Sequence, residues 1–304
     1  MGILVIGSSN TDMVAFVNHI PVPGETVLGD GFLVNPGGKG ANQAVGAARL
    51  GKDVTFCCMT GQDDNGRAAK ALFDKEGMNT SYVFSTPEKA SGVALIAVDE
   101  KGENSIVVAS GANNELKPYD IDRIDDIGKY SIILTQLETP LDTVCHIGEL
   151  AGACGVKFVL NPAPARALPE ALLKCVDIIT PNETEAEIIT GIKVDDEASA
   201  LKSARKLCDM GVKNVIITMG GKGAFVYADG MYETVPAFKV TPVDTTAAGD
   251  VFNGALCVAL SEGKSLRDAV VFASAAASIS VTRAGAQASA PYRDEVDAKL
   301  EKNQ

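Results

Sequence analysis

The segment Asp244-Thr245-Thr246-Ala247-Ala248-Gly249-Asp250 runs directly into an apolar stretch, Val251–Leu260, that has the composition of a buried helix. Asp and Thr before such a stretch are typical of a helix N-cap, and Ala-Ala-Gly allows a tight turn into the helix. The free N–H groups of Ala247–Gly249 and the positive end of the helix dipole would favour a phosphate oxygen. A purely structural Asp250 would repel that anion, whereas a general base beside it could take a proton from an incoming hydroxyl. The segment therefore predicts phosphoryl chemistry, and simple helix capping stays open as the alternative.

A second glycine-rich motif lies near the N-terminus, Asn35-Pro36-Gly37-Gly38-Lys39-Gly40-Ala41-Asn42-Gln43-Ala44. We expect it to open a helix at Ala41, with backbone amides and Asn42 facing a pocket that can pack closely on a sugar. An ordinary glycine turn is the alternative. The tetrapeptide Gly-Gly-Lys-Gly recurs at Gly220–Gly223 with different flanks, so it is no internal repeat. Neither copy is a Walker A loop, because Gly follows the Lys, and no dinucleotide-binding G-x-G-x-x-G follows the first strand.

Together the two motifs resemble the C-terminal and N-terminal signatures of the PfkB (ribokinase) family of carbohydrate kinases, the latter in the form seen in ribokinases. The similarity runs from Ile3 to about Tyr292. The resemblance implies ATP-dependent phosphorylation of D-ribose at the 5-hydroxyl to give ribose 5-phosphate, the first step of ribose catabolism. A deoxyribokinase or a fructokinase is the nearest alternative. A non-catalytic sugar-binding protein is less favoured, because a pure binder gains nothing from a desolvated base such as Asp250 beside an intact Gly249.

The resemblance also implies a role for each matching residue. Asp250 would be the base. The anion hole would be made by the amides of Ala247, Ala248 and Gly249. The sugar would be surrounded by Asn10, Asp12, Gly38, Lys39, Asn42, Glu138 and Asp250. The nucleotide would be bound by Asn182, Glu185, Thr218, Gly220, Gly223, Gly249 and Ser274. Mg²⁺ would accompany ATP, with Asn182 and Glu185 near its water shell. A monovalent cation, K⁺, would be held mostly through main-chain oxygens at Asp244, Thr246, Ser280, Arg283, Gly285 and Ser289.

Each of these sets has a plainer structural interpretation. Asn10 and Asp12 follow the first predicted strand, where open α/β sheets bind ligands, but both residue types also favour turns. The segment Asn182–Glu185 begins a predicted helix, where acidic residues favour the positive end. The segment Thr218–Gly223 reads equally as a strand-to-strand turn, and Arg283 could simply pair with a surface acid.

Composition limits the partners and the compartment. The chain has 304 residues and a formal net charge of −12, which argues against nucleic acid or an anionic membrane as a partner. Seven cysteines without a CxxC pair indicate reduced thiols, and only His19 and His146 could serve as imidazole ligands, so we expect no zinc site. The chain shows neither a basic leader nor an apolar run of membrane length. We therefore predict a cytoplasmic enzyme that binds ATP and ribose.

Strands and helices alternate along most of the chain. Strands are expected at Ile3–Ile6, Val54–Met59, Ile132–Gln136, Val156–Leu160, Val176–Thr180 and Val215–Thr218. Helices are expected at Ala41–Leu50, Gly66–Glu76, Leu141–Cys154, from Glu183, from Ala198, and at Val251–Leu260, Leu266–Ser280 and Asp294–Lys302. This alternation predicts an α/β fold with a doubly wound, mostly parallel sheet in one domain spanning residues 1–304.

Four further strands are expected, at about residues 12–17, 26–34, 93–98 and 105–110. No helix is expected between the first two of them or between the last two. The turn Asp99–Gly102 joins the last two as a hairpin. We expect a small projecting sheet that acts as a lid over the sugar. Its apolar faces would be exposed in a monomer, and such faces are usually covered, so a homodimer formed through the lid is expected.

Overall fold

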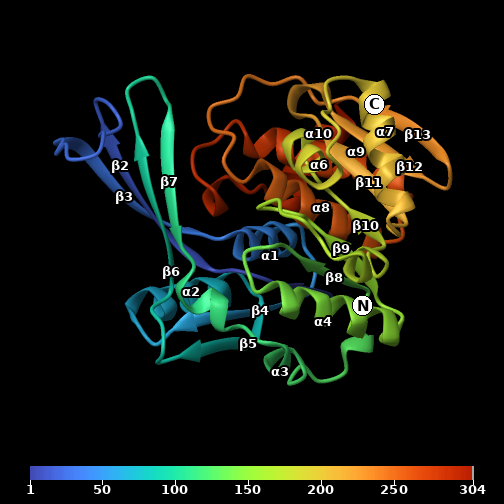
Figure 1. The fold of residues 1–304 in the computed structure, drawn as a ribbon, viewed down its shortest axis with the longest axis horizontal. Helices are drawn as coiled ribbons and strands as arrows, with labels where there is room; N and C mark the ends of the chain where they lie inside the picture. The colour runs from blue at the N-terminus through green and yellow to red at the C-terminus, as the bar shows by residue number, and fades with distance from the viewer. Residues whose placement is uncertain (303–304) are drawn as a thin grey trace.

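A nine-stranded sheet in the order β13-β12-β11-β10-β9-β8-β1-β4-β5 forms the centre of the computed structural model, which describes residues 1–302 (Figure 1). The strands from β5 through β4, β1, β8, β9 and β10 to β11 run parallel to one another. At the other end of the sheet, β12 is antiparallel to β11, and β13 is antiparallel to β12. The strands are β1 (Ile3–Ile6), β4 (Val54–Gly61), β5 (Asn79–Thr86), β8 (Ile132–Thr135), β9 (Lys157–Leu160), β10 (Ile178–Ile179), β11 (Asn214–Thr218), β12 (Ala224–Ala228) and β13 (Met231–Val235). The predicted doubly wound, mostly parallel sheet is confirmed.

Helices cover both faces of this sheet because successive side chains of each strand point to opposite sides. In β1, Ile3 and Val5 pack with α1, α2 and α8–α10, whereas Leu4 and Ile6 pack with α3–α7. The helices are α1 (Lys39–Arg49), α2 (Asp64–Lys75), α3 (Pro118–Ile121), α4 (Leu141–Cys154), α5 (Glu170–Leu173), α6 (Glu183–Thr190), α7 (Glu197–Asp209), α8 (Ala248–Ser261), α9 (Leu266–Ser280) and α10 (Arg293–Glu301). Short 3₁₀ turns lie at η1 (Gly111–Glu115), η2 (Ile127–Lys129), η3 (Gly220–Lys222) and η4 (Gln287–Ser289).

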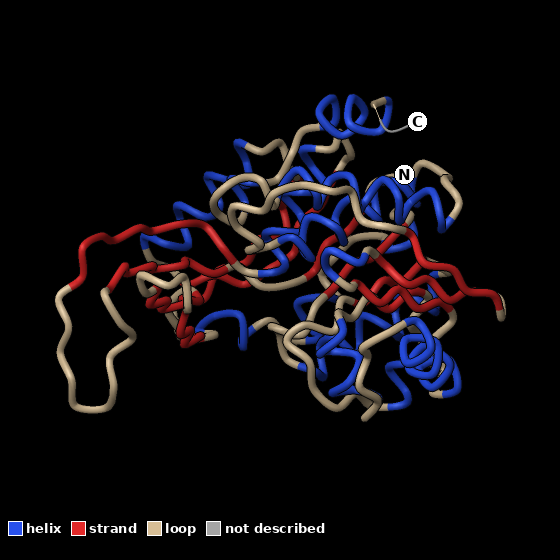
Figure 2. Tube along the Cα trace, turned by 90° about the horizontal axis from the view of Figure 1, so that it is seen from above, coloured by secondary structure: helices blue, strands red, loops and turns tan. Residues whose placement is uncertain are grey.

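A separate four-stranded sheet, hereafter the lid, projects from one end of the molecule in the order β3-β2-β6-β7. Its strands are β2 (Asn10–Val17), β3 (Gly29–Gly37), β6 (Gly92–Val98) and β7 (Asn104–Ala109). Figure 2 shows these strands extending clear of the helices. The lid confirms the predicted small sheet and its hairpin, with one correction. The second strand begins at Gly29 and not at residue 26, because its partner β2 ends at Val17 and residues 22–25 form a hydrogen-bonded turn.

Several elements differ from the predicted ones. The expected strand Val176–Thr180 is reduced to Ile178–Ile179, since the Val176 amide bonds back to the Leu173 carbonyl in a turn. Strands β5, β12 and β13 were not predicted. All seven cysteines are free thiols, and burial raises the pKa of Cys57, Cys58 and Cys257, the three that are fully buried. Within residues 1–302, no helix is both long enough and apolar enough to span a bilayer.

Candidate active site

The predicted site residues meet where the carboxyl ends of the central strands face the first turns of α1 and α8. Asp250 lies in the first turn of α8 and is 6% exposed. Its Oδ2 accepts a hydrogen bond from Asn42 Nδ2 at 2.9 Å, and its Oδ1 accepts one from Gln43 Nε2 at 3.0 Å. Burial raises the pKa of Asp250, while the Lys39 ammonium and the two amide donors act in the opposite direction. The result is a desolvated carboxylate held by neutral donors beside one cation, which suits a general base.

The turn into α8 differs from the expected cap. The N-cap is Ala247, whose φ of 59° is left-handed, and no side chain caps the helix. Asp244 instead accepts hydrogen bonds from the amides of Thr246 at 2.9 Å and Gly285 at 2.8 Å, so the prediction of an Asp or Thr N-cap is wrong. An N-cap side chain usually reaches the helix amides from an extended backbone, and Ala247 has neither that conformation nor a side-chain oxygen.

The predicted anion hole is reduced by one donor. The Ala248 amide donates to the Thr245 carbonyl at 3.2 Å. Among residues 1–302, the Ala247 and Gly249 amides have no protein acceptor, and both residues line a small cavity next to Asp250. These two amides are therefore the donors that the loop offers to an anion.

The sugar side of the site is built from β2 and the glycine motif. Asn10 and Asp12 lie in β2 and not in a turn, so the alternative that they only cap a turn is wrong. Asn10 Oδ1 accepts from Asn113 Nδ2 at 2.7 Å, and Asn113 Oδ1 accepts from the Ser9 amide at 2.9 Å, which fixes the orientation of both side chains. Burial, together with the nearby Glu138 carboxylate, raises the pKa of Asp12 to about 6.

The glycine motif starts its helix two residues earlier than predicted, at Lys39 instead of Ala41. Gly38 has a φ of 90°, and a Cβ on Gly40 would lie 2.5 Å from the Ser8 amide nitrogen, so side chains are excluded where α1 meets the end of β1. Glu138 accepts from Ser8 Oγ at 2.5 Å and from the Lys39 amide at 3.0 Å. Asn42 donates to Asp250 through Nδ2, whereas its buried Oδ1 has no hydrogen-bond partner among residues 1–302.

Lys39 is the cation at the centre of this side of the site. Burial alone would lower its pKa, but the surrounding carboxylates, led by Asp250 and Glu138, raise it. Lys39 therefore stays charged where a phosphoryl group would arrive.

A cavity of about 170 Å³, hereafter the phosphate cavity, extends from Asp250 to the residues predicted to bind phosphate. It is lined by Lys39, Asn161, Ala163, Thr180, Asn182, Glu185, Thr218, Thr245, Ala247, Ala248, Gly249, Asp250 and Asn253. Asn182 and Glu185 also form a reciprocal helix cap, with 2.8 Å bonds from each backbone amide to the other side chain. Burial raises the pKa of Glu185. The capping interpretation of this segment is thus observed, and both side chains still border the cavity.

A larger cavity, of about 470 Å³, continues from this point and brings together Thr218, Gly220, Gly223, Gly249 and Ser274. Gly220 begins the turn η3 between β11 and β12, and Gly223 directly follows it, so the segment is a strand-to-strand turn that also forms a cavity wall. Ala224, Ala237, Phe252 and Ala277 add apolar surface. An apolar cavity of this size next to a phosphate-sized one suits a nucleotide.

The predicted cation residues gather beside the Asp244 turn. Val243 and Asp244 both donate from their amides to the Val281 carbonyl, and the hydroxyls of Ser280 and Ser289 are 3.2 Å apart. The Arg283 side chain pairs with Glu295, as the plainer interpretation expected. Residues 1–302 contain no group of three or more His, Cys, Asp or Glu side chains that could hold a metal ion.

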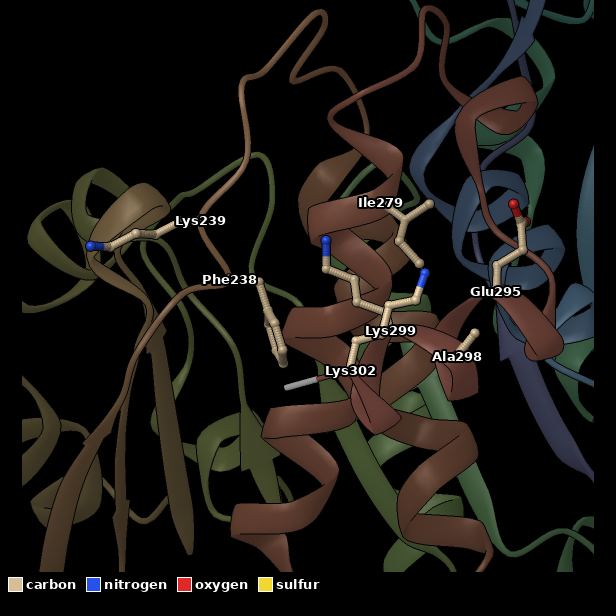
Figure 3. A pocket seen from close by; sticks show the side chains of 7 residues that line it. All are labelled: Phe238, Lys239, Ile279, Glu295, Ala298, Lys299 and Lys302. Carbon is tan, nitrogen blue, oxygen red and sulfur yellow. The ribbon is translucent and has the colours of Figure 1, made fainter. Parts of the chain in front are cut away.

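A further surface cavity, of about 380 Å³, lies outside the site. It shares Phe238 and Lys239 with the larger cavity. In Figure 3 the Phe238 ring faces the α9–α10 side, whereas the Lys239 side chain points away from the other labelled residues. Residues 238–239 thus lie between the two cavities and line both.

Four buried polar residues of the site were missed from the sequence: Gln43, Asn161, Thr180 and Asn253. Asn161 and Thr180 stand at the ends of β9 and β10, the same kind of position that singled out Asn10. Gln43 and Asn253 lie inside the two quoted motifs, one residue after Asn42 and three after Asp250. The signal available in the sequence was that Gln43 directly follows Asn42 and that Asn253 lies about one helical turn after Asp250.

Comparisons with known proteins agree with this geometry. Residues 2–293 match the family described as pfkB family carbohydrate kinase. The chain is 48% identical over 292 residues to a ribokinase of Haemophilus influenzae, covering 96% of this chain and 95% of the relative. It is also 40% identical over 306 residues to a deoxyribokinase of Salmonella typhi, with full coverage of both. Among solved structures, an Arabidopsis thaliana ribokinase complexed with ribose and ATP superposes with a TM-score of 0.92 at 32% identity, covering 99% of this chain and 98% of the other.

Proposed function

This chain belongs to the pfkB family of carbohydrate kinases, and we propose that its reaction is the transfer of the γ-phosphoryl group of ATP to the 5-hydroxyl of D-ribose. The observation that carries this proposal is the position of Asp250. The buried carboxylate borders the cavity that holds the two free amides, and it is linked through Asn42 to the glycine motif on the sugar side. A hydroxyl and a phosphoryl group can therefore meet at one point.

The reaction needs positioning and charge stabilisation more than covalent help from the protein. Asp250 accepts the proton of the sugar hydroxyl, and the donors around its carboxylate favour the ionised form against the effect of burial. Lys39 and the free amides of Ala247 and Gly249 stabilise the negative charge on the transferred group. The same short segment thus removes the proton and binds the charge.

Ribose is the proposed substrate because a ribokinase of Haemophilus influenzae is similar over almost the whole chain. The deoxyribokinase of Salmonella typhi makes deoxyribose the alternative. A coupled assay with ATP and a panel of ribose, deoxyribose, fructose and adenosine tests the proposal. We expect the highest kcat/KM with ribose. Preference for deoxyribose would assign the alternative, and ribose binding without turnover on any sugar would indicate a binding protein.

Mg²⁺ is the proposed companion of ATP. The donors at hand fit an ion held mainly by the nucleotide, because among residues 1–302 the phosphate cavity is bordered by two carboxylates, Glu185 and Asp250. Mg²⁺ usually keeps several waters and binds through phosphates and one or two carboxylates. Glu185 would face its water shell, and the ion would neutralise phosphate charge during transfer.

K⁺ is the proposed monovalent activator, at the turn that joins Asp244 to the segment 280–289. Asp244 accepts from Thr246 and Gly285, so it ties the loop before α8 to the C-terminal turn. These hydrogen bonds hold the pKa of Asp244 below its ordinary value despite partial burial, so its charge is available to a cation. Carbonyl and carboxylate oxygens suit a large, weakly hydrated ion.

Initial rates with K⁺ replaced by Na⁺ or by tetramethylammonium, at constant ionic strength, test this role. We expect K⁺ to give the highest rate, because an ordered loop presents the amides before ATP binds. Equal rates in all three salts would remove the cation site.

We also propose a homodimer formed through the lid and a cytoplasmic location. The lid exposes large apolar side chains on both of its outer strands, among them Phe32 at 63% and Val107 at 63%. Exposed apolar faces of this kind mark interaction sites.

A further inference from the structure

Gln43 lies behind Asp250 and makes three hydrogen bonds with one side chain. Its Nε2 donates to Asp250 Oδ1 at 3.0 Å and to Asn161 Oδ1 at 3.0 Å, and its Oε1 accepts from Gln136 Nε2 at 2.6 Å. A primary amide has two N–H donors, so both are used. Turning the amide over would place its oxygen against the Asp250 carboxylate and lose all three bonds. The orientation of Gln43 is therefore determined.

The hydrogen bonds continue from Asn161 back to the first turns of α8, the helix that carries Asp250. Asn161 Nδ2 donates to the Thr180 carbonyl at 3.1 Å, and Thr180 Oγ1 donates to Asn253 Oδ1 at 2.6 Å. Asn253 Nδ2 then donates to the Gly249 carbonyl at 2.8 Å. Because Gly249 precedes Asp250, the chain of bonds closes into a ring, hereafter the amide ring, made of Gln43, Asn161, Thr180, Asn253, Gly249 and Asp250.

The amide ring joins residues from four elements, at the ends of those elements that face the site. Gln43 comes from α1, Asn161 and Thr180 follow β9 and β10, and Asn253 lies on α8 with the base. Gln43, Asn161, Thr180 and Asn253 are 0%, 6%, 1% and 1% exposed. Asn161, Thr180 and Asn253 border the phosphate cavity, whereas Gln43 does not line it. Gln43 can therefore affect the reaction only through the groups that it holds.

We propose that Gln43 is a positioning residue that fixes the Asp250 carboxylate and, through the amide ring, keeps it in register with the Gly249 loop that binds the phosphoryl charge. Without these donors the Asp250 side chain could rotate relative to the neighbouring Gly249 amide, and a displacement of about 1 Å can lower turnover about a hundredfold. The inference rests on the proposed kinase function.

The charged groups facing Asp250 must be known before its proton affinity is used as a readout. They are Lys39 from α1, Glu138 from the segment after β8, Asp12 from the lid and Glu185 from α6. A change at Gln43 leaves all four in place. A change in the pH profile would then report the loss of the donor itself.

Two substitutions at one position separate charge from packing. Gln43→Met keeps the side-chain length and removes the donors, and Gln43→Glu replaces the donor facing Asp250 by a second carboxyl group. We expect kcat to fall between about tenfold and a hundredfold in both. The acidic limb of the kcat profile should move to higher pH in both and by about one pH unit or more in Gln43→Glu, since a nearby like charge raises a carboxyl pKa. Ribose Kd should stay within roughly threefold, because the sugar side is untouched.

Thr143→Val is the matched control for loss of a buried hydrogen bond. Its hydroxyl is fully buried and donates to the Leu116 carbonyl at 2.7 Å on the opposite face of the sheet. Its Tm should fall while kcat and the acidic limb stay unchanged. If Gln43 variants do not fold, Gln136→Glu tests the same idea, because a carboxylate facing Gln43 Oε1 would turn the amide over against Asp250. An unchanged kcat and acidic limb in folded variants would overturn the inference. Absence of turnover in the unsubstituted enzyme would instead count against the proposed function.

Discussion

The carboxyl edge of the central sheet and the lid both depart from the usual distribution of residues. The first buries polar side chains, and the second exposes apolar ones. At the sheet edge, polar side chains such as Gln43 and Asn253 are buried and hydrogen-bonded, the first to Asn161 and the second to the Gly249 carbonyl. In the lid, large apolar side chains such as Phe32 and Val107 are exposed without a cover. Burying polar groups costs free energy unless each is hydrogen-bonded, and exposing apolar surface costs free energy until something covers it. The first region finds most of its hydrogen-bond partners within one chain, although Asn42 Oδ1 and Gln136 Oε1 have none among residues 1–302. The second region is where we propose that another surface binds.

The same contrast separates rigidity from motion. A closed set of hydrogen bonds inside a low-dielectric interior resists displacement of any one member. The strands of the lid are hydrogen-bonded to one another, but the sheet projects from the molecule, so we expect it to move as a unit more easily than the sheet edge.

The largest expected effect tests the sheet edge. Asp250→Asn keeps the shape of the side chain but removes the base, so we expect kcat with ribose to fall about a hundredfold or more while Tm and ribose Kd change little. Steady-state kinetics and calorimetry measure both quantities. Asp120→Asn, a buried carboxylate on α3 away from the site, is the control and should keep its turnover. A loss below tenfold in Asp250→Asn would exclude Asp250 as the base.

The next prediction concerns Asp12, where lid and sheet edge meet. Its pKa of about 6 lies above the ordinary value of 3.8. The folded protein therefore keeps this proton to a higher pH than the unfolded chain, and the free energy of unfolding falls as pH rises from about 4 to 6. Asp12→Asn removes this penalty, so the sugar-free protein should gain about 1–2 kcal/mol at pH 7, a figure reduced for partial exposure.

The same substitution should weaken ribose binding by about 1–3 kcal/mol, because a hydrogen-bond acceptor for the sugar is lost. Denaturation curves at pH 4, 6 and 7 and ribose titrations measure both effects. Asp30→Asn, an exposed acid on β3, is the control. If ribose affinity and pH dependence both match the unsubstituted protein, Asp12 has no role in sugar binding.

The smallest expected effect tests the lid. Val107 pairs with Leu95 across β6 and β7, and both are exposed. Val107→Lys places a charge on this face and should raise the dimer dissociation constant at least about tenfold, as desolvating an unpaired charge at an interface is costly. Light scattering over a concentration series measures it. Met231→Lys, an equally apolar exposed site on the edge strand β13, should leave assembly unchanged. A monomer of the unsubstituted protein at assay concentration would contradict the lid dimer.

The sequence predicted the fold well because its signals are local. Glycine stops, apolar strands and the Asp99–Gly102 turn each determine nearby backbone. The N-cap of α8 was missed because Ala247 adopts a left-handed conformation that alanine rarely takes. The donors around Asp250 were not predicted, because Asn42 was assigned to the sugar and Gln43 to no role. Gln43 and Asn161 come together through helix α1 and strand β9, which are far apart in the chain. Contacts of that kind depend on how elements pack.

The close packing of α1 against α8 at Gly254 limits which substitutions this protein can accept during evolution. A Cβ at this position would lie 2.6 Å from the Gln43 carbonyl oxygen and 3.0 Å from the Ala47 amide nitrogen. The two helices therefore approach through a gap that only a hydrogen atom fills. A residue with no side chain and no contact with any substrate thus sets how near Asn42 and Gln43 come to the base. In a saturation mutagenesis screen for growth on the sugar, position 254 should be as intolerant as a catalytic position, although it has no chemistry of its own.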